Sequence, residues 1–245
     1  MSIYPDQAFI LAAGKGTRLK PYTDQLPKPL VPVRGKPILH HTLEKLQNDG
    51  VQNIIINTHY FGDMIKSCQD DFPQLNIQFS NEKDLLNTGG GVKKALSHLK
   101  EKDFFMINGD AFWDDSPQSS VFERLSKEWN PEIMDILLLL QPISQMNLTK
   151  GIGDYDISAD GQAKRSPHKN GDYMFAGIRI TKPSLFEDVQ EDCFSFLNLM
   201  DEAEAKGKLY GLVHNAAWHH ISTPEDLERV NQASEKSLSS IEKSA

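Results

Sequence analysis

The chain of 245 residues contains little cysteine and no long apolar run. Cys68 and Cys193 are its only cysteines, and their spacing matches no metal motif, so neither a disulfide framework nor a structural zinc site is expected. A membrane-spanning helix needs about eighteen consecutive apolar residues, and no segment approaches that. Residues 1–7 contain no basic region followed by an apolar run, so no signal peptide is expected. We therefore predict a cytoplasmic protein without a membrane partner.

Positive charge is also scarce. Lysine and arginine number 26 against 34 acidic residues, which gives a formal net charge of −8. A nucleic-acid partner is not expected, because binding a polyanion needs a broad basic face. No protein partner is indicated, and the oligomeric state is left open. The length suits one α/β domain over residues 1–245.

Against this acidic background, one stretch is basic and rich in glycine: Phe9 to Pro37, FILAAGKGTRLKPYTDQLPKPLVPVRGKP. Its first four residues are apolar, as in a buried strand, and Gly14 and Gly16 follow shortly after. Lysines and arginines within it are opposed by a single acid, Asp24. Glycine lets backbone amides approach a ligand closely, and the cations attract anions. The stretch therefore predicts a phosphate-binding loop.

Two common phosphate-binding motifs do not fit this loop. A P-loop requires Gly-x-x-x-x-Gly-Lys-Ser/Thr, which no window satisfies. A dinucleotide fingerprint requires a third glycine where Leu19 stands, which argues against a dinucleotide dehydrogenase.

The run LAAGKGTRLKPYTDQLPKPLVPVRGKPIL closely resembles the signature of the sugar-1-phosphate nucleotidyltransferases, in which LAAGxGTR is followed by PKPLxPV. The resemblance implies transfer of a nucleoside monophosphate from a nucleoside triphosphate to a sugar 1-phosphate, with release of pyrophosphate. It implies that Arg18 steadies the pyrophosphate and that Lys28 draws the two phosphates together. The nucleotide-binding residues that it implies in this loop are Leu11, Ala12, Ala13, Gly14, Gly16, Thr17 and Arg18.

Beyond the loop, segments of strand and helix length alternate, which predicts an α/β fold with a doubly wound, mainly parallel sheet. The resemblance likewise implies a Rossmann-like nucleotide-diphospho-sugar transferase fold. Residues 234–245 are expected to form a polar tail that frays. The expected strands are 9–12, 53–57, 76–80, 104–108, 135–140, 173–180 and 208–213, and the expected helices are 37–46, 61–70, 92–99, 121–129 and 196–206.

Three glycines follow Thr88, directly before the expected helix 92–99. They predict either amides exposed at the positive end of that helix or a tight turn. In the resembling family a motif at this place receives the nucleobase, and TGGG is similar to the form in short bacterial members that make UDP-N-acetylmuramate. The resemblance therefore implies base contacts by Thr88, Gly89 and Gly90.

The apolar strand 104–108 ends at Asn108, and Gly109 and Asp110 follow. A carboxylate just past a central strand can hold a divalent cation. The family places its magnesium-binding aspartate in such a setting, so the resemblance implies that Asp110 binds Mg²⁺ and that Asn108 lies beside the nucleotide. Asp114 and Asp115 are either second ligands or solvated acids of the next loop.

The segment from Trp218 to Leu227 resembles the family's W-x-D-[VI]-G-T-P-E-D-L, but His220 replaces the aspartate that would complete the metal site. Neutral imidazole binds Mg²⁺ poorly and suits Mn²⁺ or another divalent cation better. His220 is therefore either a metal ligand of that kind or a hydrogen-bonded residue in the ligand's place. At most one of His219 and His220 should face the site, because adjacent strand residues face opposite sides.

Short strands and turns over 142–171 predict a sugar-side hairpin region rather than a separate domain. The triplet Gly153-Asp154-Tyr155 resembles the family's GDF-like segment, and Phe175-Ala176-Gly177-Ile178, in the expected strand 173–180, resembles its F-[TA]-G-I segment. The resemblance implies that Gly153, Asp154 and Gly177 bind the sugar. The short chain without a C-terminal β-helix, together with TGGG, favours UTP and N-acetylmuramate 1-phosphate as substrates. GTP with mannose 1-phosphate is the alternative, and a non-catalytic nucleotide-sugar sensor is the alternative of another class.

Overall fold

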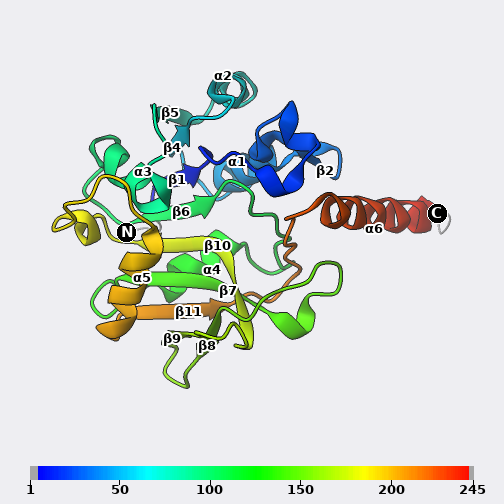
Figure 1. The fold of residues 1–245 in the computed structure, drawn as a ribbon. Coiled ribbons are helices and arrows are strands. Elements are labelled where there is room, and N and C mark those ends of the chain that lie inside the picture. The colour runs from blue at the N-terminus through cyan, green and yellow to red at the C-terminus, as the bar shows by residue number, and fades with distance from the viewer. Residues whose placement is uncertain (1–4, 243–245) are drawn as a thin grey trace.

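A computed structural model describes residues 5–242, with side chains to residue 234. Its main sheet has the strand order β11-β7-β10-β6-β1-β4-β5 (Figure 1). Each of these strands begins and ends within two residues of the predicted bounds. They are β1 Gln7–Leu11, β4 Asn53–Thr58, β5 Asn76–Asn81, β6 Phe104–Asn108, β7 Ile136–Pro142, β10 Tyr173–Thr181 and β11 Leu209–Val213.

The predicted doubly wound, mainly parallel sheet is confirmed, with one reversed strand. β6, β1, β4 and β5 run parallel to one another, and so do β11 and β7. β10 lies between β6 and β7 and is antiparallel to both. Its amino end therefore reaches the edge of the sheet where β1, β4 and β6 have their carboxyl ends. In open α/β sheets, ligands bind at this edge.

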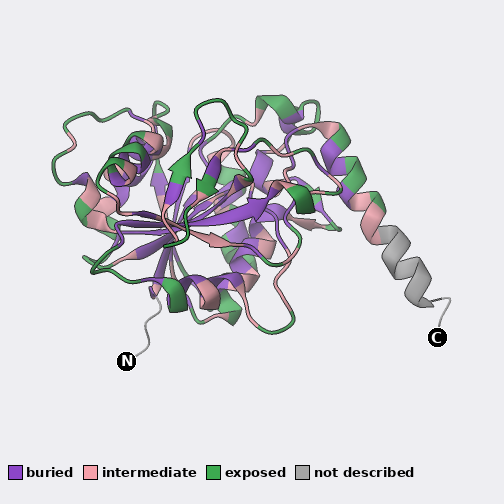
Figure 2. Ribbon diagram, turned by 90° about the horizontal axis from the view of Figure 1, so that it is seen from below, coloured by how far each residue is buried: buried purple, intermediate pink, exposed green. Residues whose placement is uncertain are grey.

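Helices cover both faces of the sheet. α1 (Ile38–Asn48), α2 (Gly62–Lys66) and α4 (Val121–Glu128) pack on one face, and α3 (Asn87–Ala95) and α5 (Phe196–Ala205) pack on the other. Apolar strand residues alternate between the two layers, as period-two geometry requires. Figure 2 shows the buried strands between the helical layers.

The three consecutive glycines lie inside α3 and not before it, which corrects the prediction. A Cβ on Gly89 would fall 2.3 Å from the Phe194 ring, and one on Gly90 would fall 2.1 Å from the Asp192 carbonyl oxygen. The amides of both glycines already donate to the Phe194 carbonyl, at 2.9 and 3.2 Å. Glycine is a poor helix former, so this close packing explains its presence here. These two amides are not free to bind a base.

The segment between β7 and β10 leaves the sheet and returns to it. Within it, β8 (Tyr155–Ile157) and β9 (Ala163–Arg165) pair as a hairpin, and β8 also pairs with β10. The two ends of the excursion meet, because the Ile143 amide donates to the Asp172 carbonyl at 2.9 Å.

The last helix, α6 (Pro224–Glu242), leads away from the body of the molecule (Figure 1). Thr223 caps its start, since the Asp226 amide donates to the Thr223 hydroxyl at 3.3 Å. The expected polar tail from residue 234 continues this helix to Glu242, and residues 243–245 lie outside the described residues. In the described part of the chain, no helix combines the length and apolarity needed to cross a membrane.

Candidate active site

A pocket of about 610 Å³ opens where β1, β4 and β6 end. It is lined by the glycine-rich loop, by the start of α3 and by residues 108–110. Segments far apart in sequence thus meet at the edge where the strand pattern placed the ligand. The predicted residues that line it are Leu11, Ala12, Ala13, Gly14, Gly16, Thr17, Arg18, Lys28, Thr88, Asn108 and Asp110.

The two glycines of the loop have different roles. Gly16 has a φ of 63°, and a Cβ there would fall 2.9 Å from the Cβ of Lys28, so both conformation and packing require glycine. The Thr23 hydroxyl donates to the Gly16 carbonyl at 2.9 Å and holds this turn. Gly14 has no atom within 4 Å of the place where a Cβ would lie. The open space beside Gly14 allows a ligand to approach the backbone.

Lys28 and Asp110 form an ion pair on the pocket wall. Lys28 Nζ lies 2.7 Å from Asp110 Oδ2, and their side chains are 10% and 40% exposed. Burial raises the pKa of Asp110, but the charge and hydrogen bond of Lys28 outweigh it and bring the pKa below its usual value. Asp110 therefore stays ionised at neutral pH, with a cation beside it in a pocket suited to phosphate.

His219 and His220 have different neighbours, although they lie outside any regular strand. His219 Nε2 lies 3.2 Å from an Arg34 guanidinium nitrogen and 3.6 Å from Asp114 Oδ2. His220 is on the Asp110 side, where burial lowers its pKa below the usual value although the charge of Asp110 raises it. Its imidazole is accordingly neutral at pH 7.

The predicted sugar-binding residues Gly153, Asp154 and Gly177 are not among the residues that line this pocket. Gly177 has a φ of 81°, and a Cβ on it would fall 3.1 Å from the Cβ of Asn108, so it adjoins the pocket through Asn108. Asp154 accepts from the Phe175 amide at 3.3 Å, and burial raises its pKa. A Cβ on Gly153 would fall 1.9 Å from the Gly171 carbonyl oxygen, so this glycine is required by packing within the excursion.

The Asp110 carboxylate fits a cation that binds together with phosphate and water and needs few protein ligands. Within the described residues, no three or more His, Cys, Asp or Glu side chains group as a metal site. Mg²⁺ often takes only one or two protein carboxylates, together with waters and substrate phosphates, and Asp110 can supply one of these. Asp114 binds Arg34 at 2.5 Å and Asp115 binds Lys45, which engages both acids elsewhere.

Comparison with known proteins identifies the family. The profile of a family described as nucleotidyl transferase matches residues 7–142. The chain belongs to this family. An N-acetylmuramate alpha-1-phosphate uridylyltransferase of Caulobacter vibrioides is 33% identical to this nucleotidyl transferase over 233 residues, which cover 92% of this chain and 95% of the relative.

Other relatives of this nucleotidyl transferase use a different base. A D-glycero-alpha-D-manno-heptose 1-phosphate guanylyltransferase of Campylobacter jejuni is 30% identical over 224 residues, covering 90% of this chain and 96% of the relative. The crystal structure of HddC from Yersinia pseudotuberculosis complexed with GMP-PN superposes with a TM-score of 0.71 at 26% identity, covering 94% of this chain and 99% of that one.

These findings confirm the predicted family, the sugar-1-phosphate nucleotidyltransferases, and the prediction that the chain is an enzyme. They give no support to a non-catalytic sensor, because the relatives are transferases by name. The sugar named in the guanylyltransferase relative is a heptose 1-phosphate and not the mannose 1-phosphate considered above.

Sequence reasoning missed two buried polar residues on the pocket wall of this nucleotidyl transferase, Asn57 and Glu82. Asn57 accepts from the Ala12 amide and donates to a Glu82 carboxylate oxygen, both at 2.7 Å. The other oxygen of Glu82, which is 2% exposed, accepts from the Leu86 amide at 3.0 Å. Asn57 directly follows the apolar run of its strand, as Asn108 does, and that parallel could have revealed it. The other lining residues that were missed are Pro29, Leu85, Asn87, Gly109 and Cys193.

The Asp114 carboxylate should make stability sensitive to acid. Burial raises its pKa, but hydrogen bonds from His219 and Arg34 outweigh this and bring the pKa well below the usual 3.8. Its stabilising contribution is therefore complete above the unfolded-state pKa and is lost as the pH falls through the lower folded-state pKa. We expect Asp114→Asn to reduce the acid-induced fall in the free energy of unfolding. Denaturant titrations at a series of pH values below about 6 would measure this, and identical pH profiles would contradict it.

Proposed function

We propose that this nucleotidyl transferase transfers uridine monophosphate from UTP to N-acetylmuramate 1-phosphate, forming UDP-N-acetylmuramate and pyrophosphate. The similarity to the Caulobacter uridylyltransferase over 92% of this chain and 95% of that relative carries this proposal. Because nucleoside triphosphates are kept inside the cell, we place the reaction in the cytoplasm.

In this reaction an oxygen of the sugar phosphate attacks the α-phosphorus of the triphosphate, and the bond to the β-phosphate oxygen breaks. The electron pair of that bond leaves with pyrophosphate. A phosphate monoester is already largely ionised near pH 7, so the attack needs no general base. The chain's task is to align two anions and to neutralise their charge.

Three features of the pocket suit that task. The bare backbone at Gly14 lets the triphosphate approach the loop amides. Arg18 lines the pocket and would steady the leaving pyrophosphate. Lys28 is almost buried and held by Asp110, so its ammonium group is fixed in place before substrate binds, where it would draw the two phosphates together.

We propose that Asp110 holds a divalent cation, Mg²⁺ or Mn²⁺, and that His220 lies beside it as a neutral imidazole. When bound, such a cation offsets the negative charge on the phosphate oxygens around the reacting phosphorus. His220 is a softer ligand than the aspartate that the family motif has at this place, so it would favour Mn²⁺ over Mg²⁺ as a direct ligand. Gly153, Asp154 and Gly177 remain the proposed sugar-side residues.

Guanylyl transfer is a second candidate, because the chain is also 30% identical to a heptose 1-phosphate guanylyltransferase, with 90% of this chain and 96% of that relative covered. Two relatives with a guanine nucleotide or guanylyl activity in their names agree with this reading.

Pyrophosphate release from the purified protein tests the function. UTP, GTP, CTP, ATP and dTTP would each be combined with N-acetylmuramate, mannose, heptose and glucose 1-phosphates, with Mg²⁺, Mn²⁺ or a chelator. We expect release only with UTP and N-acetylmuramate 1-phosphate together, and none with chelator. Release with GTP and a heptose or mannose phosphate would favour the second candidate. No release from any pair would contradict both.

A further inference from the structure

A buried arginine with no acidic partner lies next to the pocket. Arg179, on β10, is 3% exposed. Its guanidinium carbon lies 4.7 Å from the centre of the Phe175 ring and 4.5 Å from that of Phe196. Burial lowers its pKa to about 9, so it is still charged at neutral pH. Within the described residues no carboxylate pairs with it, and an unpaired buried charge is costly.

The polar contacts of Arg179 point to Asn108. One guanidinium nitrogen donates to Asn108 Oδ1 at 3.0 Å, and the other contacts the Met200 sulfur at 3.3 Å, a weak acceptor. The buried Nε has no partner in the described structure. Asn108 Oδ1 is therefore the one strong acceptor that Arg179 uses.

This contact settles how the Asn108 amide is turned. Arginine has donors and no acceptor, so only the oxygen of the amide can face it. The Asn108 NH₂ group must then lie on the other side, and it has no hydrogen-bond partner among the residues described. Gly177 leaves the room for it, because a Cβ there would fall 3.2 Å from Asn108 Nδ2. Asn108 lines the pocket, so the NH₂ group is the polar group that it can offer a ligand.

We propose that Arg179 is a positioning residue: it holds the Asn108 side chain so that the two N–H donors of the Asn108 amide face the bound substrates. This inference rests on the proposed function. The group recognised is an acceptor oxygen, supplied either by the nucleotide or by the sugar phosphate. Asn108 lies opposite Leu11, which lines the pocket, and next to Gly177, a proposed sugar-side residue, so its NH₂ group would meet an oxygen of either substrate.

A double-mutant cycle tests whether Arg179 acts through Asn108. Arg179→Met, Asn108→Ala and the double variant would be assayed for kcat and for the KM of each substrate. We expect each single variant to lower kcat/KM by about tenfold or more, and the double variant to be no worse than Asn108→Ala. The substrate whose KM rises most identifies the source of the oxygen. Arg179→Lys, which keeps a charged donor, should recover part of the loss.

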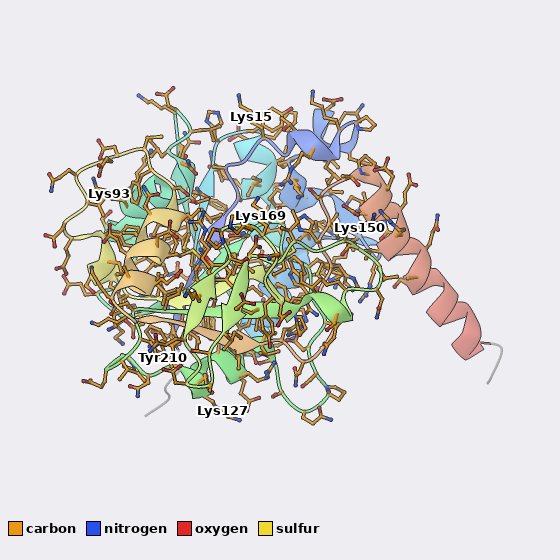
Figure 3. All side chains as sticks on the ribbon, turned by 60° about the horizontal axis from the view of Figure 1, so that its bottom comes forward. Lys15, Lys93, Lys127, Lys150, Lys169 and Tyr210 are labelled. Carbon is orange, nitrogen blue, oxygen red and sulfur yellow. The ribbon has the colours of Figure 1, made fainter. Side chains whose placement is uncertain are left out.

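Arg124→Met is the matched control. Arg124, on α4, also donates to an asparagine, Asn215 Oδ1, at 2.7 Å, but neither residue lines the pocket. Figure 3 shows Lys127, on the same helix, on the opposite side of the molecule from Lys15 of the glycine-rich loop. We expect kcat/KM of this variant to be unchanged. If Arg179→Met does not fold, Arg179→Gln, which retains a donor without the charge, replaces it in the cycle.

Each outcome bears on one of the two proposals. If the fold losses in kcat/KM of the two single variants multiply in the double variant, or if Arg124→Met loses as much as Arg179→Met, the positioning role is overturned. The proposed function is then unaffected. If the wild type turns over no substrate pair, the proposed function fails. The affinities of the same four proteins for UTP and for N-acetylmuramate 1-phosphate would then be measured by calorimetry in place of kcat/KM. Additive effects there, or no binding, would overturn the positioning role as well.

Discussion

Asp110→Asn is expected to lower kcat for pyrophosphate release by about two to three orders of magnitude, with a smaller effect on the KM for UTP. Asparagine keeps the size of the side chain and loses its charge. Lys28 would then lose the carboxylate that holds its ammonium group at 2.7 Å, and the divalent cation would lose its proposed carboxylate ligand. Steady-state assays at saturating substrate, repeated across Mg²⁺ concentrations, would measure the change.

Asp114→Asn provides the matched control for this variant. Asp114 is close in sequence, but its carboxylate binds Arg34 and lies beside His219, away from Lys28. We expect its kcat to stay within about twofold of the wild type, because Asp114 does not line the pocket. A wild-type rate for Asp110→Asn, or an equal loss in both variants, would remove Asp110 from the proposed mechanism.

Gly90→Ala is expected to destabilise the protein by about 2–4 kcal/mol. The added methyl carbon would fall 2.1 Å from the backbone oxygen of Asp192, so either α3 or the segment 192–194 must move. Such a shift would also weaken the two hydrogen bonds from Gly89 and Gly90 to the Phe194 carbonyl. Equilibrium unfolding in urea would measure the loss.

Gly14→Ala is the companion variant with the opposite expectation. No atom lies within 4 Å of the added carbon, so the free energy of unfolding should change by less than about 0.5 kcal/mol. UTP binding should weaken, because the methyl group would occupy the space through which phosphate approaches the backbone. If the Gly90→Ala variant were instead as stable as the wild type, the expected clash would be absent, because the segment 192–194 could move away from the added methyl group at little cost in free energy.

Local sequence predicted the strands well, because buried parallel strands are continuous apolar runs. The run 104–108 is one example, and its ends match β6. The loop at Gly14 and Gly16 was also identified, together with Lys28 and Asp110, because glycine and lysine suit phosphate, and a carboxylate suits a divalent cation, whatever their neighbours are. The structure then placed all four on one pocket wall.

Features that depend on distant contacts could not be predicted. The three glycines have the composition of a turn, and only the packing of residues 192–194 against them makes a helix possible. The reversed direction of β10 follows from how the chain returns to the sheet, which no local pattern encodes. Arginine side chains are rarely fully buried, so the sequence gave no sign that Arg179 packs against the rings of two phenylalanines.

The excursion between β7 and β10 gives the molecule an exchangeable part. Its two ends are joined by the hydrogen bond from the Ile143 amide to the Asp172 carbonyl, so residues can be added or removed in its exposed turns while β7 and β10 stay paired. The glycine-rich loop and α3, which line the pocket on the nucleotide side, belong to other segments. The proposed sugar-side residues Gly153 and Asp154 lie in this excursion, so under the proposed function a change of acceptor would need changes in one stretch of chain only, and a laboratory chimera with junctions at Ile143 and Asp172 would test this.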